Sequence, residues 1–205
     1  MARNIAPITK QSRREGYALH PKAYKIMVKR TGIPGQHSGS RQSKPSQYAL
    51  QLREKQKVKR LYGLLEKQFV KLVKEASKST GQTGELLLMY LERRLDNVIY
   101  RSGLAPSRQA ARQLVTHGHF LLNGRRVDIP SIRVNSGDVI NLRPKSLKNK
   151  YFANINDLSP GTDKTSSSWL KCDRKKFEIK ITGSPKREEA EPDINEQLIV
   201  EYYSR

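Results

Sequence analysis

The chain has 205 residues, and its 40 Lys and Arg against 19 Asp and Glu give it a formal net charge of +21 and a pI near 10.2. So large a charge indicates a polyanionic partner, without choosing among RNA, DNA and anionic lipid. No apolar run approaches the ~20 residues of a membrane span, and the N-terminus lacks a signal-peptide core. Because Cys172 is the single cysteine, no internal disulfide can form, and we expect a cytoplasmic protein with no membrane partner.

Residues 1–45 are predicted to form a basic arm, with ten Lys and Arg against one acid and no sustained apolar periodicity. Such a segment cannot bury enough apolar surface to offset its ordering entropy, so we expect it to be mobile when alone. One interpretation is a solvated tail. The interspersed Tyr17, His20, Tyr24 and His37 can stack on bases and favour an arm that becomes ordered on RNA.

Residues 46–91 are predicted to form a helical lobe. Val58, Leu61 and Leu65 keep the helical period within a long helix or a helix pair, and Ser46 is a candidate N-cap. A charged helix face is often only solvated, so the spacing alone leaves RNA contact and solvation equally open. The basic residues of the opposite face are Arg53, Lys55, Lys57, Lys59 and Arg60.

Residues 92–156 contain a stretch with an unusual basic composition. Every basic residue from Arg93 to Arg126 is arginine, whose planar fork grips phosphate bidentately and stacks on bases. Asp96 is the one acid in that window. We expect it to orient Arg93 or a neighbouring arginine rather than to transfer protons.

The same stretch predicts two short helices beside a small sheet. Apolar residues at three- and four-residue spacing predict a helix that begins near Leu88 and ends near Ser102, and Ser107 is expected to cap a second helix that stops at Gly118. Arginines from both elements can then converge on one side. The predicted strands are 120–122, 125–127 and 138–142, the first two joined by a hairpin at Asn123-Gly124.

Residues 157–183 are predicted to be a turn-rich connector that ends in a short strand at 177–181. Asp193 and Glu196 have capping-box spacing, which predicts a closing helix over 194–203. The acidic residues between 186 and 193 are interpreted as a solvated loop or as a contact with a basic protein neighbour.

The stretch RLDNVIYRSGLAPSRQAARQLVTHGHFLLNGRRVDIPS, followed by GDVI, resembles the RNA-binding module named after the S-four family of small-subunit ribosomal proteins. Several RNA-modifying and tRNA-charging enzymes also carry this module. PGQH at 34–37, SQYALQLREKQKVKRLYG at 46–63 and the terminal INEQLIVEYYSR extend the resemblance to bacterial members of the family over nearly the whole chain. It implies an α+β fold: an extended basic arm, a helical lobe of 46–91 completed by 184–205, and short helices on a small, mostly antiparallel sheet.

The resemblance also implies a non-catalytic role. Members of the family bind the five-way junction of the 5′ domain of small-subunit ribosomal RNA and nucleate assembly. They contact ribosomal protein S-five at an interface linked to decoding accuracy, help line the channel by which messenger RNA enters, and in some bacteria repress their own operon. Many hold zinc through N-terminal cysteines, but this sequence has none before Cys172. We therefore expect no metal, no cofactor and no homo-oligomer.

Candidate contacts follow from the basic composition together with the resemblance. Arg41 and Lys44, which follow PGQH, are expected to face the messenger RNA. His117 and His119 make a weak ligand set for a metal and are interpreted as structural or RNA-contacting. The predicted ribosomal RNA contacts are Arg3, Arg13, Arg14, Gln36, His37, Arg53, Lys55, Gln56, Lys57, Arg60, Arg93, Arg94, Asn97, Arg108, Arg112, His117, His119, Asn123 and Arg125.

Two other functional classes stay open. An RNA-modifying enzyme could use the module as an accessory, but it would need a separate catalytic domain, whereas the other segments are a basic arm, a helical lobe and a tail. A stress protein that recognises stalled ribosomal particles would associate with ribosomes in less than one copy per small subunit.

Overall fold

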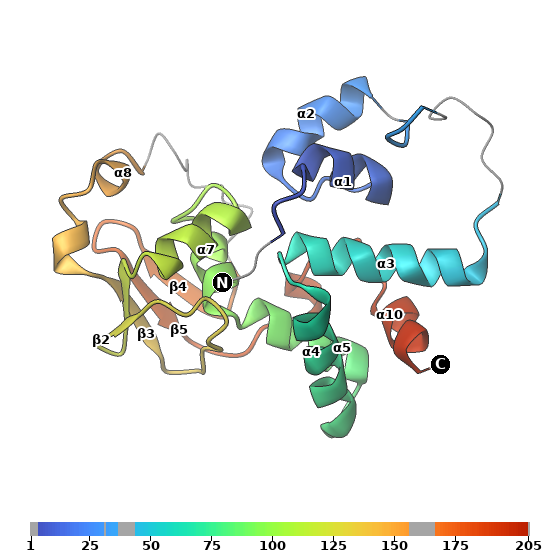
Figure 1. Cartoon of the computed structure of the whole chain (residues 1–205). Coiled ribbons are helices and arrows are strands. Elements are labelled where there is room, and N and C mark those ends of the chain that lie inside the picture. Colours follow the sequence, from blue (N-terminus) through green and yellow to red (C-terminus); the bar gives the residue numbers. More distant parts are fainter. Residues whose placement is uncertain (1–3, 31, 37–43, 156–166, 205) are drawn as a thin grey trace. The chain divides into compact units, whose positions relative to one another are not determined.

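The computed structural model describes residues 4–30, 32–36, 44–155 and 167–204, which form an α+β fold (Figure 1). Contacts divide the chain into two compact units. Unit 1 comprises Met1–Leu87 and Asp193–Arg205, and unit 2 comprises Leu88–Pro192. The sequence-based boundaries were placed at 92 and 184, whereas these divisions fall at 88 and 193.

Unit 1 is helical in its described residues. The predicted long helix or helix pair is the pair α3 and α4, separated by a turn at Gly63, and the hydroxyl of Ser46 accepts the Ala49 N–H at 3.3 Å, which confirms the predicted cap. Val58 and Phe69 are fully buried between the helices. The helices of this unit are α1 (Ile8–Glu15), α2 (Pro21–Lys29), α3 (Gln47–Leu61), α4 (Glu66–Lys78), the first half of α5 (Thr83–Glu92) and α10 (Glu196–Tyr203).

Part of the predicted basic arm is helical, as α1 and α2. The Ser12 hydroxyl donates to the Ile8 carbonyl and accepts the Leu19 N–H, while Ala23 is fully buried. Glu15, at the end of α1, forms ion pairs with arginines of α3. Local apolar periodicity is weak here, and contacts distant in sequence supply the ordering that the pattern does not reveal.

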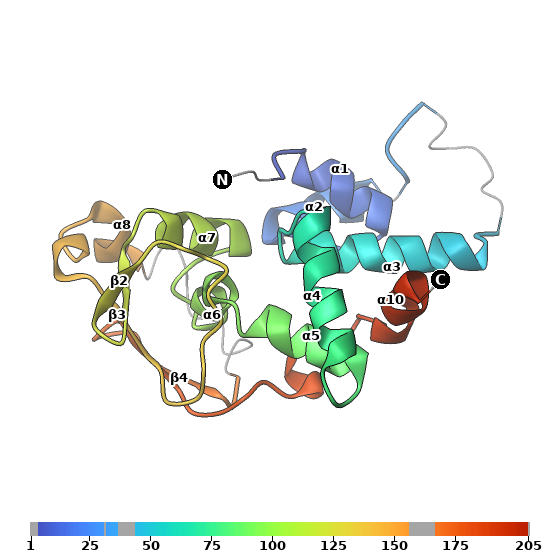
Figure 2. The same ribbon diagram turned by 60° about the horizontal axis from the view of Figure 1, so that its bottom comes forward.

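Helix α10 packs on α3, and both views show the two helices side by side (Figures 1 and 2). Gln51 donates to Glu201 at 2.8 Å, and Ile199 is fully buried. The predicted cap is corrected: Asn195, rather than Asp193, caps the helix by accepting the Gln197 N–H at 3.1 Å. The helix thus begins two residues later than predicted.

Unit 2 holds an antiparallel sheet whose strand order is β2-β1-β3-β5-β4 in the described residues. The hairpin at Asn123-Gly124 is confirmed, with φ of 49° and 80° at these two residues. The connector contains a strand that was not predicted, β4. The elements are the second half of α5, α6 (Leu95–Arg101), α7 (Arg108–Thr116), β1 (Phe120–Leu122), β2 (Arg125–Val127), β3 (Val139–Leu142), η1 (Pro144–Ser146), α8 (Lys150–Ala153), β4 (Leu170–Asp173), β5 (Glu178–Ile181) and η3 (Arg187–Glu189).

The core of unit 2 lies between α6, α7 and one face of the sheet (Figure 1). Val98, Ala111, Ile140 and Ile179 are fully buried in it. Phe152 of α8 closes one side through edge-on contacts with Phe120 and other rings. This packing makes the sheet and both helices a rigid support for the basic side chains.

The predicted helix from Leu88 to Ser102 is interrupted, and this prediction is corrected. Arg94 is extended and pairs with Arg133 in an isolated β-bridge. The Leu95 N–H donates to the Ile132 carbonyl at 2.8 Å, and the Val134 N–H donates to the Arg93 carbonyl at 2.9 Å. The apolar residues of α5 and α6 keep a three- and four-residue spacing across the break, and both helices bury them. The sequence pattern therefore gave no sign of the interruption.

Candidate nucleic-acid interface

Several arginines of unit 2 are held by groups of the protein itself. Asp96 accepts two bonds from Arg94, Nε at 3.1 Å and a terminal nitrogen at 2.7 Å, and both side chains are buried. Arg112 lies 3.7 Å from the same carboxylate. Arg93 donates to the Val134 carbonyl at 2.8 Å and to the Asn135 side chain. The predicted orienting role of Asp96 is confirmed, for the neighbour Arg94.

A second internal cluster surrounds Asn97, whose amide is buried. It donates to the Glu92 carboxylate at 2.7 Å and accepts from Arg108 Nε at 2.9 Å. Glu92 also receives both arms of the Arg101 fork, at 3.0 and 2.9 Å. Here the planar guanidinium satisfies carboxylates and amides of the protein by the bidentate geometry it would use on phosphate.

These clusters change the interpretation of two predicted contacts. Arg94 is 5 % exposed and Asn97 is 2 % exposed, and the bonds described above use their polar atoms. Neither can reach a phosphate without dismantling buried polar contacts. The structure gives both residues a positioning role, so the absence of lysine in this stretch partly reflects internal bonding.

Other basic residues lie on the edge strand β2 and on the segments just before β1 and just after β3, two segments that the pairing of β1 with β3 places side by side. Arg125 and Arg126 are exposed on the edge strand β2. Gly118 has φ of +69°, and a Cβ there would lie 2.7 Å from Arg126 Nε, so glycine suits both the backbone and the arginine that covers it. The His119 carbonyl accepts the Arg143 N–H at 2.8 Å. We call this group of residues the basic edge: His117, His119, Arg125, Arg126 and Arg143.

The two histidines of the basic edge differ in environment. His119 Nδ1 lies 2.9 Å from the Ser146 hydroxyl, and its ring packs edge-on against Phe152. Burial, then the nearby His117 and Arg143, lower the pKa of His119, which favours its neutral form. His117 is exposed. His119 can therefore offer an imidazole face or a hydrogen bond, while Arg125, Arg126 and Arg143 supply the positive charge.

Asn123, also a predicted contact, sits at the tip of this hairpin. Its amide donates to Asp138 at 2.8 Å, and its oxygen accepts the Val139 N–H at 2.9 Å. Asn123 thus locks the turn, and the exposed arginines that follow it are the side chains able to contact RNA. Sequence reasoning left Arg126 and Arg143 out of the predicted contacts, because only strand pairing brings them beside His119.

In unit 1, Arg53 and Arg60 are oriented by Glu15, whose side chain is fully buried. Burial raises the pKa of Glu15 in spite of the two arginines. Lys57 donates to the Asp193 carbonyl at 2.6 Å and pairs with Glu54 at 2.8 Å. The exposed Arg53 remains available to a phosphate.

Lys55 has a role different from the predicted one. Its side chain is buried, its ammonium lies 2.8 Å from the Glu66 carboxylate, and it sits 4.7 Å from the centre of the Tyr202 ring. Tyr203 donates its hydroxyl to the same carboxylate at 2.8 Å. Lys55 therefore fastens α10 and is not a surface contact.

The predicted RNA-contacting residues near the N-terminus differ in their exposure to solvent. Arg13 donates to the Gly32 carbonyl at 3.0 Å, whereas Arg14, Gln36 and Lys44 are exposed. Arg3, His37 and Arg41 lie outside the described residues. Helix α2 exposes Tyr24, which the sequence analysis expected to stack on bases, and three lysines that the predicted contacts omitted although their charge was visible in the sequence: Lys22, Lys25 and Lys29.

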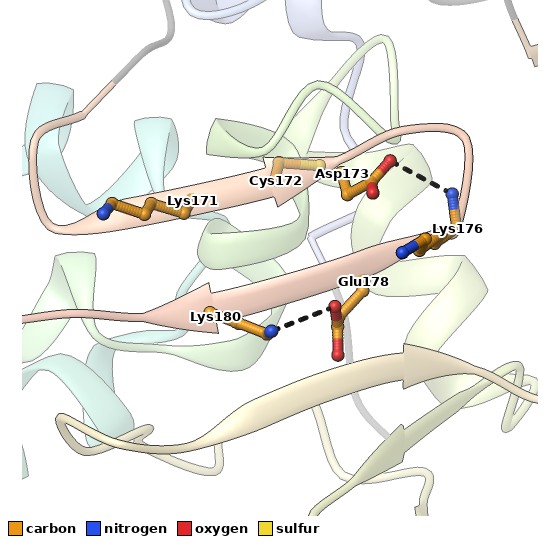
Figure 3. A pocket seen from close by; sticks show the side chains of 6 residues that line it. All are labelled: Lys171, Cys172, Asp173, Lys176, Glu178 and Lys180. Atoms are coloured by element: carbon orange, nitrogen blue, oxygen red, sulfur yellow. Dashed lines mark hydrogen bonds and ion pairs between the residues drawn. The ribbon is translucent and has the colours of Figure 1, made fainter.

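A shallow hollow of about 270 Å³ on the β4–β5 hairpin is a candidate catalytic site (Figure 3). Asp173 accepts backbone N–H groups of Lys175 and Lys176, and Glu178 lies 3.4 Å from the Lys180 ammonium. Burial raises the pKa of the Cys172 thiol, which keeps it protonated. These side chains close a hairpin turn and carry no nucleophile paired with a base.

Two further kinds of feature are absent from the part of the chain that the structure describes. There, no three His, Cys, Asp or Glu side chains come close enough together to hold a metal ion. Within those same ranges, no helix has the length and apolar character needed to cross a membrane.

Comparison with known proteins agrees with the basic surface. The family model described as "Ribosomal protein S4/S9 N-terminal domain" matches residues 3–92, and the "S4 domain" model matches residues 93–140. The small ribosomal subunit protein uS4 of Chlorobium phaeovibrioides is 50 % identical over 206 residues, covering 100 % of both chains. The chain belongs to the uS4 family of ribosomal proteins.

Further uS4 relatives show the same full-length correspondence. That of Chloroflexus aurantiacus is 48 % identical over 206 residues, and that of Chlorobaculum tepidum 50 % over 205 residues, each covering 100 % of both chains. The uS4 family is one of ribosomal proteins rather than enzymes. The S4 domain match includes β1, β2 and most of the basic edge.

Proposed function

We propose that this protein is a structural constituent of the small ribosomal subunit that binds small-subunit ribosomal RNA in the cytoplasm. The observation that carries this proposal is the basic edge: β2 exposes Arg125 and Arg126, Arg126 covers Gly118 between the two histidines, and Arg143 donates its backbone N–H to His119. A-form RNA hides its base edges in a deep groove, so a rigid protein reads it through phosphates and 2′-hydroxyl groups. Arginines on a fixed edge suit that form of recognition.

The proposed binding site comprises exposed and half-buried predicted contacts together with those that the structure adds. In unit 1 these are on α1–α3, and in unit 2 they are on the hairpin and its neighbours. Arg93, Arg108 and Arg112 are half-buried, and each has a partner within the protein. The residues proposed to touch RNA are Arg14, Lys22, Lys25, Lys29, Gln36, Arg53, Gln56, Lys57, Arg60, His117, His119, Arg125, Arg126 and Arg143, with Arg3, Arg13 and His37 as expectations from the sequence.

Footprinting the purified protein on protein-free small-subunit RNA tests this function. Protection should fall on one folded junction, in the 5′ domain, and affinity should fall steeply with salt, by about 0.7–0.9 log units per phosphate contacted for each log unit of salt. Uniform weak protection along the whole RNA would contradict the proposal, because it would indicate unspecific attraction of a cationic protein.

Replacing Arg125 and Arg126 together with glutamine should weaken ribosomal RNA binding on the order of tenfold and reduce the salt slope by about one to two. The matched control removes two charges from the far edge of the same sheet, by Lys171→Gln with Lys180→Gln. Filter binding over a salt series measures both. Equal losses in the two double variants would show that net charge, not the basic edge, determines affinity.

We further propose that the protein nucleates subunit assembly, contacts ribosomal protein S-five and contributes to decoding accuracy, as the family resemblance suggests. Arg41 and Lys44 are proposed to face messenger RNA. Replacing both with alanine should lower the messenger-unwinding activity of reconstituted ribosomes while leaving ribosome binding intact. Full unwinding activity in that variant would refute the role.

The alternative function is that of an RNA-modifying enzyme, because such enzymes can carry an S4 domain as an accessory. The hollow on the β4–β5 hairpin gives it no catalytic pair among the described residues. Assaying RNA for modification after incubation with the protein separates the two functions.

A further inference from the structure

The acidic side chain of Glu191 forms ion pairs with the guanidinium groups of Arg101 and Arg108. Glu191 Oε1 lies 2.7 Å from a terminal nitrogen of Arg108 and 3.5 Å from one of Arg101. The three side chains are only 11–20 % exposed, so the contacts are well shielded from solvent. This carboxylate comes from the acidic segment that the sequence analysis interpreted as a solvated loop or as a contact with a basic protein neighbour.

The two arginines are held in place by other groups as well. Arg101 makes its bidentate contact with Glu92, and Arg108 Nε donates to Asn97. The Arg108 guanidinium also lies 4.6 Å from the centre of the Tyr100 ring, a cation–π contact. Removing Glu191 would therefore leave the orientation of Arg108 largely intact.

Glu191 itself belongs to a short segment outside any helix or strand. It follows the single turn η3, ending at Glu189, and precedes Pro192. Its carbonyl accepts from Arg187 at 3.4 Å, at the limit of a hydrogen bond. Glu191 lies between the buried Ala190 and Ile194 but outside any helix or strand, so a rotation of its side chain can move the carboxylate without breaking a regular element.

A carboxylate and a phosphate diester each present two anionic oxygens to a guanidinium fork. We propose that Arg101 and Arg108 form a latent phosphate site whose resident ligand is Glu191, and that an RNA phosphate takes the place of this carboxylate. The inference rests on the proposed RNA-binding function and adds a specificity-determining residue to it. An RNA that also contacts the rest of the proposed binding site can displace Glu191. An RNA that lacks those contacts meets Arg101 and Arg108 already neutralised by the Glu191 carboxylate.

The direct test compares Glu191→Gln with Glu188→Gln, an exposed carboxylate three residues earlier in the same segment. The two variants have the same net charge. For an unstructured oligouridylate, Glu191→Gln should bind about three- to tenfold more tightly than Glu188→Gln, with a salt slope steeper by about 0.7 for one added phosphate. The affinity for folded ribosomal RNA should change less. In the Glu191→Gln protein, the ratio of the affinity for ribosomal RNA to the affinity for oligouridylate should therefore fall.

A third variant tests whether the tighter binding of oligouridylate depends on Arg108. Adding Arg108→Gln to Glu191→Gln should return oligouridylate binding to the level of the Glu188→Gln protein. Equal binding by the Glu191→Gln and Glu188→Gln proteins would overturn the proposal, as would a gain that survives Arg108→Gln. Loss of cooperative unfolding in Glu191→Gln would also overturn it, because Glu191 would then be a structural brace and not a displaceable ligand.

The proposed function and the latent site can fail separately. A wild-type protein that gives no footprint on ribosomal RNA contradicts the function. A wild-type protein with a normal footprint, together with no difference between the Glu191 and Glu188 variants, contradicts the latent site alone.

Discussion

Replacing Asp96 with alanine should lower the free energy of unfolding of unit 2 by about 3–5 kcal/mol, the usual consequence of leaving a buried charge without its partner. Asp96 receives both arms of Arg94 and also accepts the Asn97 N–H at 3.0 Å at the start of α6. Alanine leaves a guanidinium that is 5 % exposed without its counter-charge. Chemical denaturation followed by circular dichroism measures the loss.

A double variant distinguishes a structural role of this pair from RNA contact. Arg94→Met with Asp96→Leu replaces the ion pair with apolar groups of similar size, which is often neutral for stability. We expect it to recover most of the stability lost in Asp96→Ala and to bind ribosomal RNA like the wild type. If the folded double variant bound RNA tenfold more weakly, Arg94 would be an RNA contact after all.

The second large effect concerns Glu66 and the attachment of α10. Burial alone would raise the pKa of Glu66, but hydrogen bonds from Lys55, Lys59 and Tyr203 outweigh it and lower the pKa to about 2. Glu66→Gln should therefore destabilise unit 1 at pH 7 by about 2 kcal/mol, because it also removes the charge that faces the buried Lys55. The figure is reduced for solvent screening, since the Glu66 side chain is 44 % exposed.

The pH dependence of this effect follows from the direction of the shift. Because the pKa of Glu66 in the folded protein, about 2, is below its ordinary 4.5, ionised Glu66 stabilises the fold fully above pH 4.5. That contribution falls as pH decreases towards 2. The difference in unfolding free energy between wild type and Glu66→Gln should therefore shrink across this range.

A matched control for Glu66 is Glu85→Gln, an exposed carboxylate in α5 of the same unit. It should change stability by less than about 1 kcal/mol at pH 7. A difference between wild type and Glu66→Gln that stays constant from pH 7 to pH 2 would contradict the assignment of the stabilisation to the ionised carboxylate.

The strongest local signals predicted their elements correctly. Ser46 and Ser107 both cap helices as expected, the latter by accepting the Ala110 N–H at 3.2 Å, and Asn123-Gly124 closes the hairpin. These signals depend on one or two residues whose backbone or side-chain chemistry suits a single local geometry. Such elements can be predicted from sequence, because no distant part of the chain is needed to specify them.

The predicted contacts were less well determined, because burial depends on residues far apart in sequence. Arg94 and Arg125 are equally basic in the sequence, yet Arg94 is buried against Asp96 and Arg125 is exposed. Lys55 was read as part of a basic helix face, but Glu66 and two tyrosines of α10 cover it. The sequence gives the charge of each side chain but does not show which other side chains pack around it.

The sequence by itself determined the sign and size of the charge, the α+β class and the likeness to a family of ribosomal proteins. Tertiary structure alone decided which basic groups face solvent and which are neutralised inside, including the pairing of Arg108 with Glu191, 83 residues away. The physical reason is that charge and local turn chemistry are properties of short segments. Desolvation and ion pairing arise only when strands and helices distant along the chain have packed together.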